Sequence, residues 1–383
     1  MKKIHFFIII SFWTFSFSSC NPSTNNNEST QDSTTIERNK EAREDSAKLA
    51  EAIELQSKVD FTVTALVETE AVSADINADA ADDPAIWINS QNPNKSIVLG
   101  TNKKEGLYAY WLDGKIINYQ KAGKINNVDL RDGFQYKEQK VVLVAGSNRT
   151  NNSISLFYID PIELQLSDTI ANIQSKVGDV YGVAMYKDAK NQFFIFVNGK
   201  DGQFEQWKVW SDKTGIKKEL KRTFKSNSQP EGITINDQNS MLYFGVEEEG
   251  IFKMSANPDS TANPRKLAGS DNSNPFIAYD IEGISVFHYN KKNYLLASSQ
   301  GSFSYAIFEL GEKDKYINSF KIKNRELDGV EETDGLDIVV TDLLPNFPKG
   351  IMIFQDGYNY DGDILKSQNF KFVDFEQITS LLD

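Results

Sequence analysis

Short runs of alternating apolar and polar residues make up most of the chain after residue 60. The runs are rich in β-branched and aromatic side chains, and clusters of Gly, Asn and Asp separate them. This pattern is typical of many short β-strands joined by tight turns. The sequence therefore predicts an all-β domain over residues 60–383.

Three sequence signatures recur six times in a fixed order along this domain. The first is an acidic or glycine-containing turn that leads into a strand, the second is an apolar strand ending in a polar loop, and the third is an aromatic-bearing strand. Successive first-signature glycines at 182, 232, 283 and 335 are 50, 51 and 52 residues apart. This spacing suits a four-stranded blade, so we predict a six-bladed β-propeller. A β-sandwich or a solenoid is the alternative, although neither requires a six-fold count.

The two ends of the domain indicate how the ring closes. The last repeat ends near Asp383 with no room for a fourth strand, whereas residues 61–72 form a strand without a blade of its own. Pairing the two would hide both exposed edges. We therefore expect the ring to be closed by an N-terminal strand in the last blade.

The first 59 residues differ in composition from the domain. Lys2 and Lys3 precede an apolar run at 4–17, and Ser18-Ser19-Cys20 follows, so residues 1–20 resemble a lipoprotein signal in which Cys20 is lipidated. Residues 21–59 have few large apolar side chains and predict a disordered tether, within which residues 37–54 could form a short helix. We expect an exported lipoprotein that meets a membrane or the cell surface only through this lipid, or alternatively a periplasmic or secreted protein.

Composition narrows the chemistry that the domain can perform. Cys20 is the only cysteine, and His288 is the only histidine outside the signal segment. Multi-histidine zinc or iron sites and cysteine phosphatases are therefore excluded, and any metal must have oxygen ligands, which favours calcium or magnesium. The net charge of -13 argues against a nucleic-acid partner.

Charged residues of the first two signatures should converge on one end of the channel, because the first strand of a blade begins on the face where its second strand ends. The acids are Asp82, Asp83, Asp129, Glu231, Glu247, Glu248, Asp280, Glu282 and Asp334, and the bases are Lys103, Lys104, Arg149 and Lys200, with Gln300 beside them. Crowded carboxylates repel one another unless cations neutralise them, and calcium suits such a ring. Bases beside a multi-metal site suit a phosphate whose oxygens bridge the ions.

The chain resembles the β-propeller phytases on these residues. The matching stretches lie in order between residues 82 and 378, and they include DDPAIW at 82–87, TNKK at 101–104, NNVD at 126–129, SNR at 147–149, DIEG at 280–283, LLASSQG at 295–301 and QDG at 355–357. The resemblance implies a phosphomonoester hydrolase that uses several calcium ions to release phosphate from phytate, myo-inositol hexakisphosphate.

The resemblance also implies a role for each matching residue. Positions that hold the catalytic calcium ions are matched by Tyr181, Glu231, Glu247, Asp280, Glu282 and Asp334, with Asp82 beside them. Asp83 matches a structural calcium site together with the backbone around Pro84 and Val128, and Asp129, Asp328 and Asp356 are further candidate ligands. Lys103, Arg149 and Lys200 match binders of the cleaved phosphate, whereas Lys104, Ser299 and Gln300 match groups near a second phosphate.

Two departures from the family pattern affect a stabilising calcium site more than the catalytic one. The acidic loop at 328–333 is short, which leaves the register of Asp328 open, and Tyr358 stands where an acid is common.

The proposed chemistry is direct attack of metal-activated water near neutral or mildly alkaline pH, without a phospho-enzyme. Two other functions stay open: a calcium-binding propeller lactonase or esterase, and a non-catalytic binding propeller. We expect a monomer.

Overall fold

The computed structural model describes residues 47–76, 78–343 and 346–382. The expected signal segment with Cys20 and the first part of the expected tether lie outside the described residues. Within the described part, no helix has both the length and the apolar character needed to cross a membrane.

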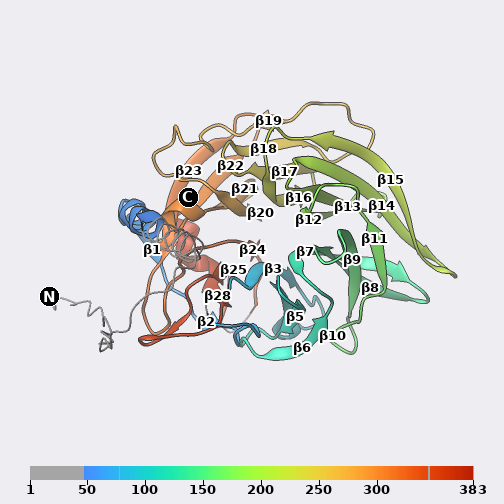
Figure 1. Ribbon diagram of the computed structural model, residues 1–383, viewed down its shortest axis with the longest axis horizontal. Coiled ribbons are helices and arrows are strands. Elements are labelled where there is room, and N and C mark those ends of the chain that lie inside the picture. The colour runs from blue at the N-terminus through green and yellow to red at the C-terminus, as the bar shows by residue number, and fades with distance from the viewer. Residues whose placement is uncertain (1–46, 77, 344–345, 383) are drawn as a thin grey trace, which may run out of the picture. The chain divides into compact units, whose positions relative to one another are not determined.

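In the part of the chain from residue 48 onward that the structure describes, six blade-forming sheets make up the body (Figure 1). Their strands pair antiparallel, except for one parallel pair at an outer edge. The first blade contains β3 (Ala81–Trp87), β4 (Ile97–Asn102), β5 (Gly106–Tyr110) and β6 (Ile116–Lys121). The second contains β7 (Ile125–Tyr136), β8 (Gln139–Asn148), β9 (Ser153–Asp160), β10 (Gln165–Leu166) and β11 (Ala171–Gln174). The third contains β12 (Val180–Lys187), β13 (Phe193–Gly199), β14 (Gln203–Asp212) and β15 (Gly215–Lys225).

The other three blades have the same order of strands. The fourth blade contains β16 (Pro230–Asn236), β17 (Met241–Val246), β18 (Gly250–Ser255) and β19 (Arg265–Lys266). The fifth contains β20 (Ile281–Tyr289), β21 (Lys292–Ser299), β22 (Ser304–Leu310) and β23 (Lys315–Ile322). The sixth contains β24 (Leu336–Val339), β25 (Ile351–Asp356) and β28 (Asn369–Asp374). The short elements are η1 (Pro93–Lys95), η2 (Gln300–Ser302), η3 (Phe375–Leu381) and the hairpin of β26 (Tyr360–Asp361) and β27 (Ile364–Leu365).

The first strands of neighbouring blades contact one another all the way around, from β3 through β7, β12, β16, β20 and β24 back to β3. This closed ring of inner strands confirms the predicted six-bladed propeller.

The N-terminal segment joins two blades rather than one. β2 (Val67–Glu68) pairs antiparallel with β28 and completes the last blade, as expected. The preceding β1 (Phe61–Val63) instead pairs parallel with β23 of the fifth blade. The single strand expected at 61–72 is therefore two short strands, and together they bridge blades five and six.

Residues 47–57 are helical, and Ala52 and Val59 are buried. The Gln56 side chain also donates a hydrogen bond to the backbone of Phe303. The body therefore begins before residue 60, because this segment carries enough apolar surface to pack on the fifth blade. The expected boundary at 59/60 moves towards the N-terminus accordingly.

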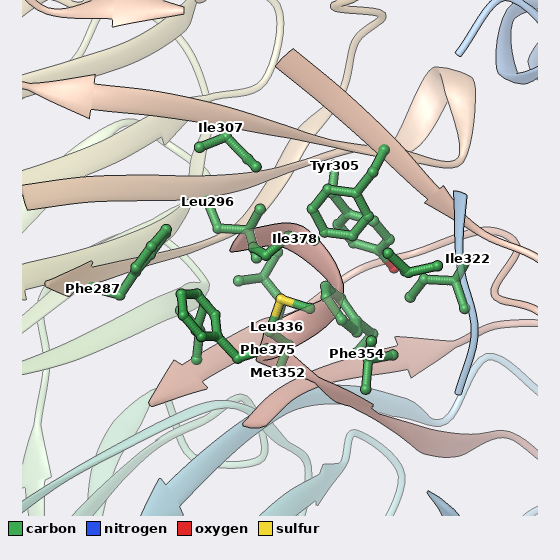
Figure 2. Close-up of a cluster of buried hydrophobic side chains, with 14 of the residues drawn as sticks. Phe287, Leu296, Tyr305, Ile307, Ile322, Leu336, Met352, Phe354, Phe375 and Ile378 are labelled. Carbon is green, nitrogen blue, oxygen red and sulfur yellow. The ribbon is translucent and has the colours of Figure 1, made fainter. Parts of the chain in front are cut away.

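The hydrophobic core is divided among the six interfaces between neighbouring blades. Figure 2 shows the interface of blades five and six, where Leu296 and Tyr305 face Met352 and Phe354. Phe375 of η3 closes the cluster. Each blade is covered on both faces by its neighbours, which explains why second strands such as β4, β8 and β13 are buried along almost their whole length.

The recurring glycines stand where inner strands approach most closely. An added Cβ at Gly182 would lie 2.1 Å from the carbonyl oxygen of Glu231, and one at Gly232 would lie 1.9 Å from that of Glu282. The contact repeats from Gly283 to Asp334. Each glycine therefore lets the next blade bring its acidic residue to the channel.

We expect Gly232→Ala to lower the free energy of unfolding by about 1–3 kcal/mol or more, because the new methyl overlaps backbone that side-chain rotation cannot move. Urea unfolding followed by tryptophan fluorescence measures this change. Gly311→Ala is the matched control, since the nearest atom to its new Cβ is 3.9 Å away. Equal stability of the two variants would contradict the packing argument.

Candidate active site

Six residues, one from each blade, stand at equivalent places at one end of the channel. In five blades the place is the first residue of a β-bulge in the inner strand, and in the sixth it lies two residues before β24 begins at Leu336. The residues are Asp82, Asn126, Tyr181, Glu231, Glu282 and Asp334. A bulge re-aims a side chain out of the regular strand alternation, so these six side chains are directed to one place.

A compact group of carboxylates lies at this place. Glu231, Glu247 and Glu282 each offer one oxygen, and these oxygens lie within 4.8 Å of one another. Glu231 and Glu282 are buried. The adjoining cavity has a volume of about 280 Å³, and Lys103 is the one base among the described residues that line it. Its acids are Asp79, Asp82, Glu231, Glu282, Glu332 and Asp334.

Burial of these acids disfavours their charged forms. It raises the pKa of Asp82 and of Asp334 to about 7, even though Lys103 opposes the shift. Burial likewise raises the pKa of Glu247 to about 7. For Glu282, burial and then repulsion by Glu231 hold the pKa well above its usual range. The cluster therefore cannot carry its full negative charge at neutral pH unless cations enter it.

Lys103 is held inside the acidic cavity. Its Nζ lies 2.9 Å from Oδ1 of Asp82, 3.1 Å from Oδ2 of Asp334 and 2.6 Å from Oδ1 of Asp79. These carboxylates raise the pKa of Lys103 despite its burial, so the ammonium stays charged. It neutralises one carboxylate and leaves the others in excess.

Asn126 links the carboxylates to the basic residues. Its Nδ2 donates to Oδ2 of Asp82 at 3.0 Å and to Oε1 of Glu231 at 3.1 Å, while its Oδ1 accepts from Nη1 of Arg149 at 3.3 Å. The side chain is fully buried. Asn126 therefore fixes the position of Arg149 relative to the acids.

Arg149 and Lys200 both lie close to the aromatic ring of Tyr181. The Lys200 Nζ lies 4.2 Å from the centre of the Tyr181 ring, and the Arg149 Cζ lies 5.7 Å from it. Burial, and then the charges of Glu231 and Glu282, raise the pKa of Tyr181, so its hydroxyl keeps its proton. Two cations and a hydroxyl donor therefore adjoin the carboxylates, an arrangement suited to binding a phosphate.

The sequence comparisons identify the family of proteins to which this site belongs. The family model described as Phytase matches residues 42–383. This chain belongs to the phytase family. It is 39% identical to the 3-phytase of Bacillus subtilis (strain 168) over 331 residues, which cover 84% of this chain and 86% of that protein. Membership favours phosphomonoester hydrolysis over the lactonase and the non-catalytic alternatives.

Two solved structures share a more distant likeness with this phytase-family chain. The structure of BBS1N in complex with ARL6DN has a TM-score of 0.46 and 10% identity, and it covers 76% of this chain and 77% of that one. A functionally unknown protein from Desulfotomaculum acetoxidans has a TM-score of 0.41 and 16% identity, with 61% and 70% covered. Likeness at this level carries no conclusion about function.

Asp83 and Asp129 face a second cavity of about 180 Å³, which is lined by residues of the inner strands. Asp83 accepts a hydrogen bond from the backbone of Val128 at 3.0 Å, and Asp129 pairs with Arg131 at 2.8 Å. Asp129 therefore does not join the carboxylate cluster. The second blade contributes Asn126 instead, because Asp129 lies beyond the bulge.

Asp328 and Asp356 belong to a separate buried cluster around Lys371. Asp328 forms an ion pair with the Lys371 Nζ, and Asp356 lies 3.5 Å from it. Glu68 of β2 contacts the same ammonium. Asp328 and Asp356 therefore do not line the acidic cavity. The positive charge that they contact is the ammonium group of Lys371.

Two other expected site residues lie outside the acidic cavity. Ser299 is fully buried, and its hydroxyl exchanges hydrogen bonds with the backbone of Ala278. Asp280 is half-buried, and burial followed by repulsion from Glu248 raises its pKa. Gln300, in contrast, reaches the cavity and donates to Asp334 at 2.7 Å.

Sequence reasoning missed several residues that shape the site. Asn126 carries no charge, so a search for acids and bases passes over it, although it occupies the same place in its repeat as Asp82 and Glu231 do in theirs. Lys124, Asp79 and Asp179 line a neighbouring basic cavity. They lie outside the three recurring signatures, and only the folded chain brings them together.

Without metal, we expect this phytase-family protein to lose stability as pH rises from about 4 to 8. Folding raises the pKa of Asp82, Asp334 and Glu247, so the folded state binds more protons than the unfolded state across that window. Thermal unfolding in chelator should therefore give a lower melting temperature at pH 8 than at pH 5. Asp334→Asn should flatten this slope, and a melting temperature that rises with pH would contradict the expectation.

Proposed function

We propose that this phytase-family chain hydrolyses the phosphate monoesters of phytate with the help of bound calcium. The observation that carries the proposal is that two cavities of opposite charge balance adjoin each other. One is lined by six acids and one base, and the other is lined mainly by bases. The first can concentrate cations, and the second can hold the anionic substrate.

The residues present fit calcium. Two oxygens bound to one calcium ion at roughly 2.4 Å each lie at most about 4.8 Å apart. The oxygens of Glu231, Glu247 and Glu282 fall within that limit. Apart from Lys103, the described cavity is lined by oxygen-bearing side chains, without histidine or cysteine, as a hard cation prefers. These three glutamates, with Asp82 and Asp334 beside them, would hold the ions.

Bound calcium would neutralise the carboxylates and the phosphate oxygens and would lower the pKa of a water molecule. Arg149 and Lys200 bind the phosphoryl oxygens and stabilise the charge that spreads over them during the reaction. Asn126 and Asp179 position Arg149 for this contact. The Tyr181 hydroxyl, which keeps its proton, donates a hydrogen bond to Glu231 and so orients that carboxylate.

The reaction is a direct displacement at phosphorus. A water oxygen forms a bond to phosphorus while the bond to the inositol oxygen breaks, and one proton of the water passes to the inositol oxygen. The products are inorganic phosphate and an inositol with one phosphate fewer and one free hydroxyl. The lining of the described cavity includes no serine, cysteine or histidine, and in this proposal its carboxylates serve as metal ligands rather than as nucleophiles. We therefore propose that no phospho-enzyme forms.

Lys103 has a double role in this proposal. Before metal binds, its ammonium neutralises the charge of Asp82 and Asp334. Once metal neutralises these carboxylates instead, the ammonium contacts the phosphate. It lines both cavities, so a rotation of its side chain suffices to exchange the two partners.

The pattern of residues 1–20 supports export, with Cys20 as the site of a lipid anchor and secretion without lipid as the alternative. We propose that the folded body acts as a monomer.

We expect phosphate release from phytate by the purified protein to require calcium and to stop when a chelator is added. Glu231→Gln should lower kcat/KM by about 100-fold or more, because it removes a central charged ligand while keeping the side-chain shape. Glu312→Gln, a change at an exposed glutamate of a blade-five turn, is the control. Full activity of Glu231→Gln, or release that is indifferent to calcium, would refute the proposed role of the carboxylates.

We expect Lys103→Met to lower kcat/KM for phytate by about 100-fold or more while calcium binding becomes no weaker. The substitution removes a phosphate contact and also a cation that competes for Asp82 and Asp334. Isothermal titration with calcium and steady-state kinetics separate the two effects. Lys115→Met, at an exposed lysine of blade one, is the control, and weaker calcium binding by Lys103→Met would contradict the double role.

A further inference from the structure

The second strand of each blade carries one residue directly opposite the bulge of the inner strand. In five blades the strand pairing places it between the two pairs that flank the bulge, and in the sixth it follows the pair of Leu336 with Phe354. In blade order the residues are Thr101, Ser147, Asn198, Gly245, Ser298 and Gln355. Apart from the glycine they are polar, and each is at most 1% exposed. Buried polar groups need hydrogen-bond partners, so this repeated choice indicates a shared role.

The polar side chains at these positions hold backbone amides of the bulges. Thr101, Ser147 and Asn198 each accept from the amide of the residue that follows the site residue, at 2.8–3.0 Å. Gln355 accepts from the amide of Asp334 itself at 2.8 Å. They therefore satisfy amides that the bulges remove from the regular strand pairing.

The same side chains also reach across to the next blade. Ser147 donates to the carbonyl oxygen of Tyr181. Asn198 donates through Nδ2 to the carbonyl oxygen of Glu231 at 3.1 Å. Equivalent bonds leave blades five and six at 3.0 and 3.3 Å. Each bond ties one blade to its neighbour at the level of the site.

Asn198 connects two residues of the proposed active site. Its Oδ1 holds the amide of Gly182, next to Tyr181, while its Nδ2 holds the carbonyl of Glu231. A Cβ added to Gly182 would lie 2.1 Å from that carbonyl oxygen, so the two segments touch without slack. Asn198 does not line the acidic cavity. It acts on the site through the backbone alone.

We propose that Asn198 is a positioning residue, which fixes the Glu231 carboxylate relative to the Tyr181 hydroxyl that donates to it. The inference rests on the proposed function, because it takes Glu231 as a calcium ligand. Groups that orient a metal ligand without touching the metal affect both metal affinity and activity. The buried amide of Asn198 therefore contributes to calcium binding and to turnover, although it meets neither ion nor substrate.

The test removes both hydrogen bonds with Asn198→Leu, which keeps about the same side-chain volume. At saturating calcium we expect kcat for phytate to fall about 10- to 100-fold, and calorimetry should give a calcium Kd weaker by about tenfold or more. Asn198→Thr should recover most of both quantities, because one hydroxyl, that of Ser147, makes both bonds at the equivalent position.

Gln206→Met is the matched control for a purely structural loss. Gln206 is fully buried, accepts from Nε of Arg222 at 2.6 Å and donates to the backbone of Ala256 at 2.9 Å. It thus joins blades three and four, as Asn198 does, but away from the acidic cavity. Thermal unfolding in chelator should give a lower melting temperature for both variants, whereas kcat and the calcium Kd should change only in Asn198→Leu.

Unchanged kcat and calcium Kd in Asn198→Leu would overturn the positioning role, as would equal losses in Gln206→Met or no recovery in Asn198→Thr. If Asn198→Leu does not fold, Asn198→Ala replaces it with the same expected losses, because its smaller side chain admits water to the two backbone groups. Absence of phosphate release by the unmodified protein would instead refute the proposed function, while the calcium Kd would still decide the role of Asn198.

Discussion

The close approach of neighbouring inner strands is the constraint on which the rest of the structure depends. At Gly182 and Gly232 there is no room for a side chain, because the carbonyl oxygen of the next blade's acidic residue occupies that space. The same bulge that creates this contact turns the preceding residue towards the channel mouth. The packing that closes the ring therefore also gathers the carboxylates, and neither feature can change without the other.

Gathering carboxylates in a buried place has an electrostatic cost that the chain does not offset by itself. Lys103 supplies one positive charge against six acids of the cavity, and burial drives the pKa of several of them towards neutrality. Protonation or bound cations can relieve the strain, so metal affinity and stability come from the same arrangement. The contrast with Lys371 is instructive: there a buried ammonium contacts Glu68, Asp328 and Asp356 directly.

The two cavities at the channel mouth divide the work of a hydrolase acting on a polyanion. Acids concentrate in one cavity, four bases line the other, and Lys103 and Asp79 lie at the boundary between them. An anionic substrate is repelled by the chain as a whole, since the net charge is -13, but it meets positive charge at this boundary. Asn126 keeps the boundary rigid, because its amide contacts Asp82, Glu231 and Arg149 together.

The sequence by itself determined the number of blades and the type of chemistry. Glycines such as Gly232 and Gly283 recur because close approach tolerates no other residue, and a body with the single histidine His288 and no cysteine leaves oxygen ligands for any metal. Only the tertiary structure decided which polar residues meet. Asn126 lies within the bulge of β7, whereas Asp129 lies three residues later, after the bulge. The side chain of Asn126 therefore enters the site, and that of Asp129 does not. Lys124 and Arg149 become neighbours through backbone hydrogen bonds between separate loops, and no local pattern in the sequence encodes such contacts.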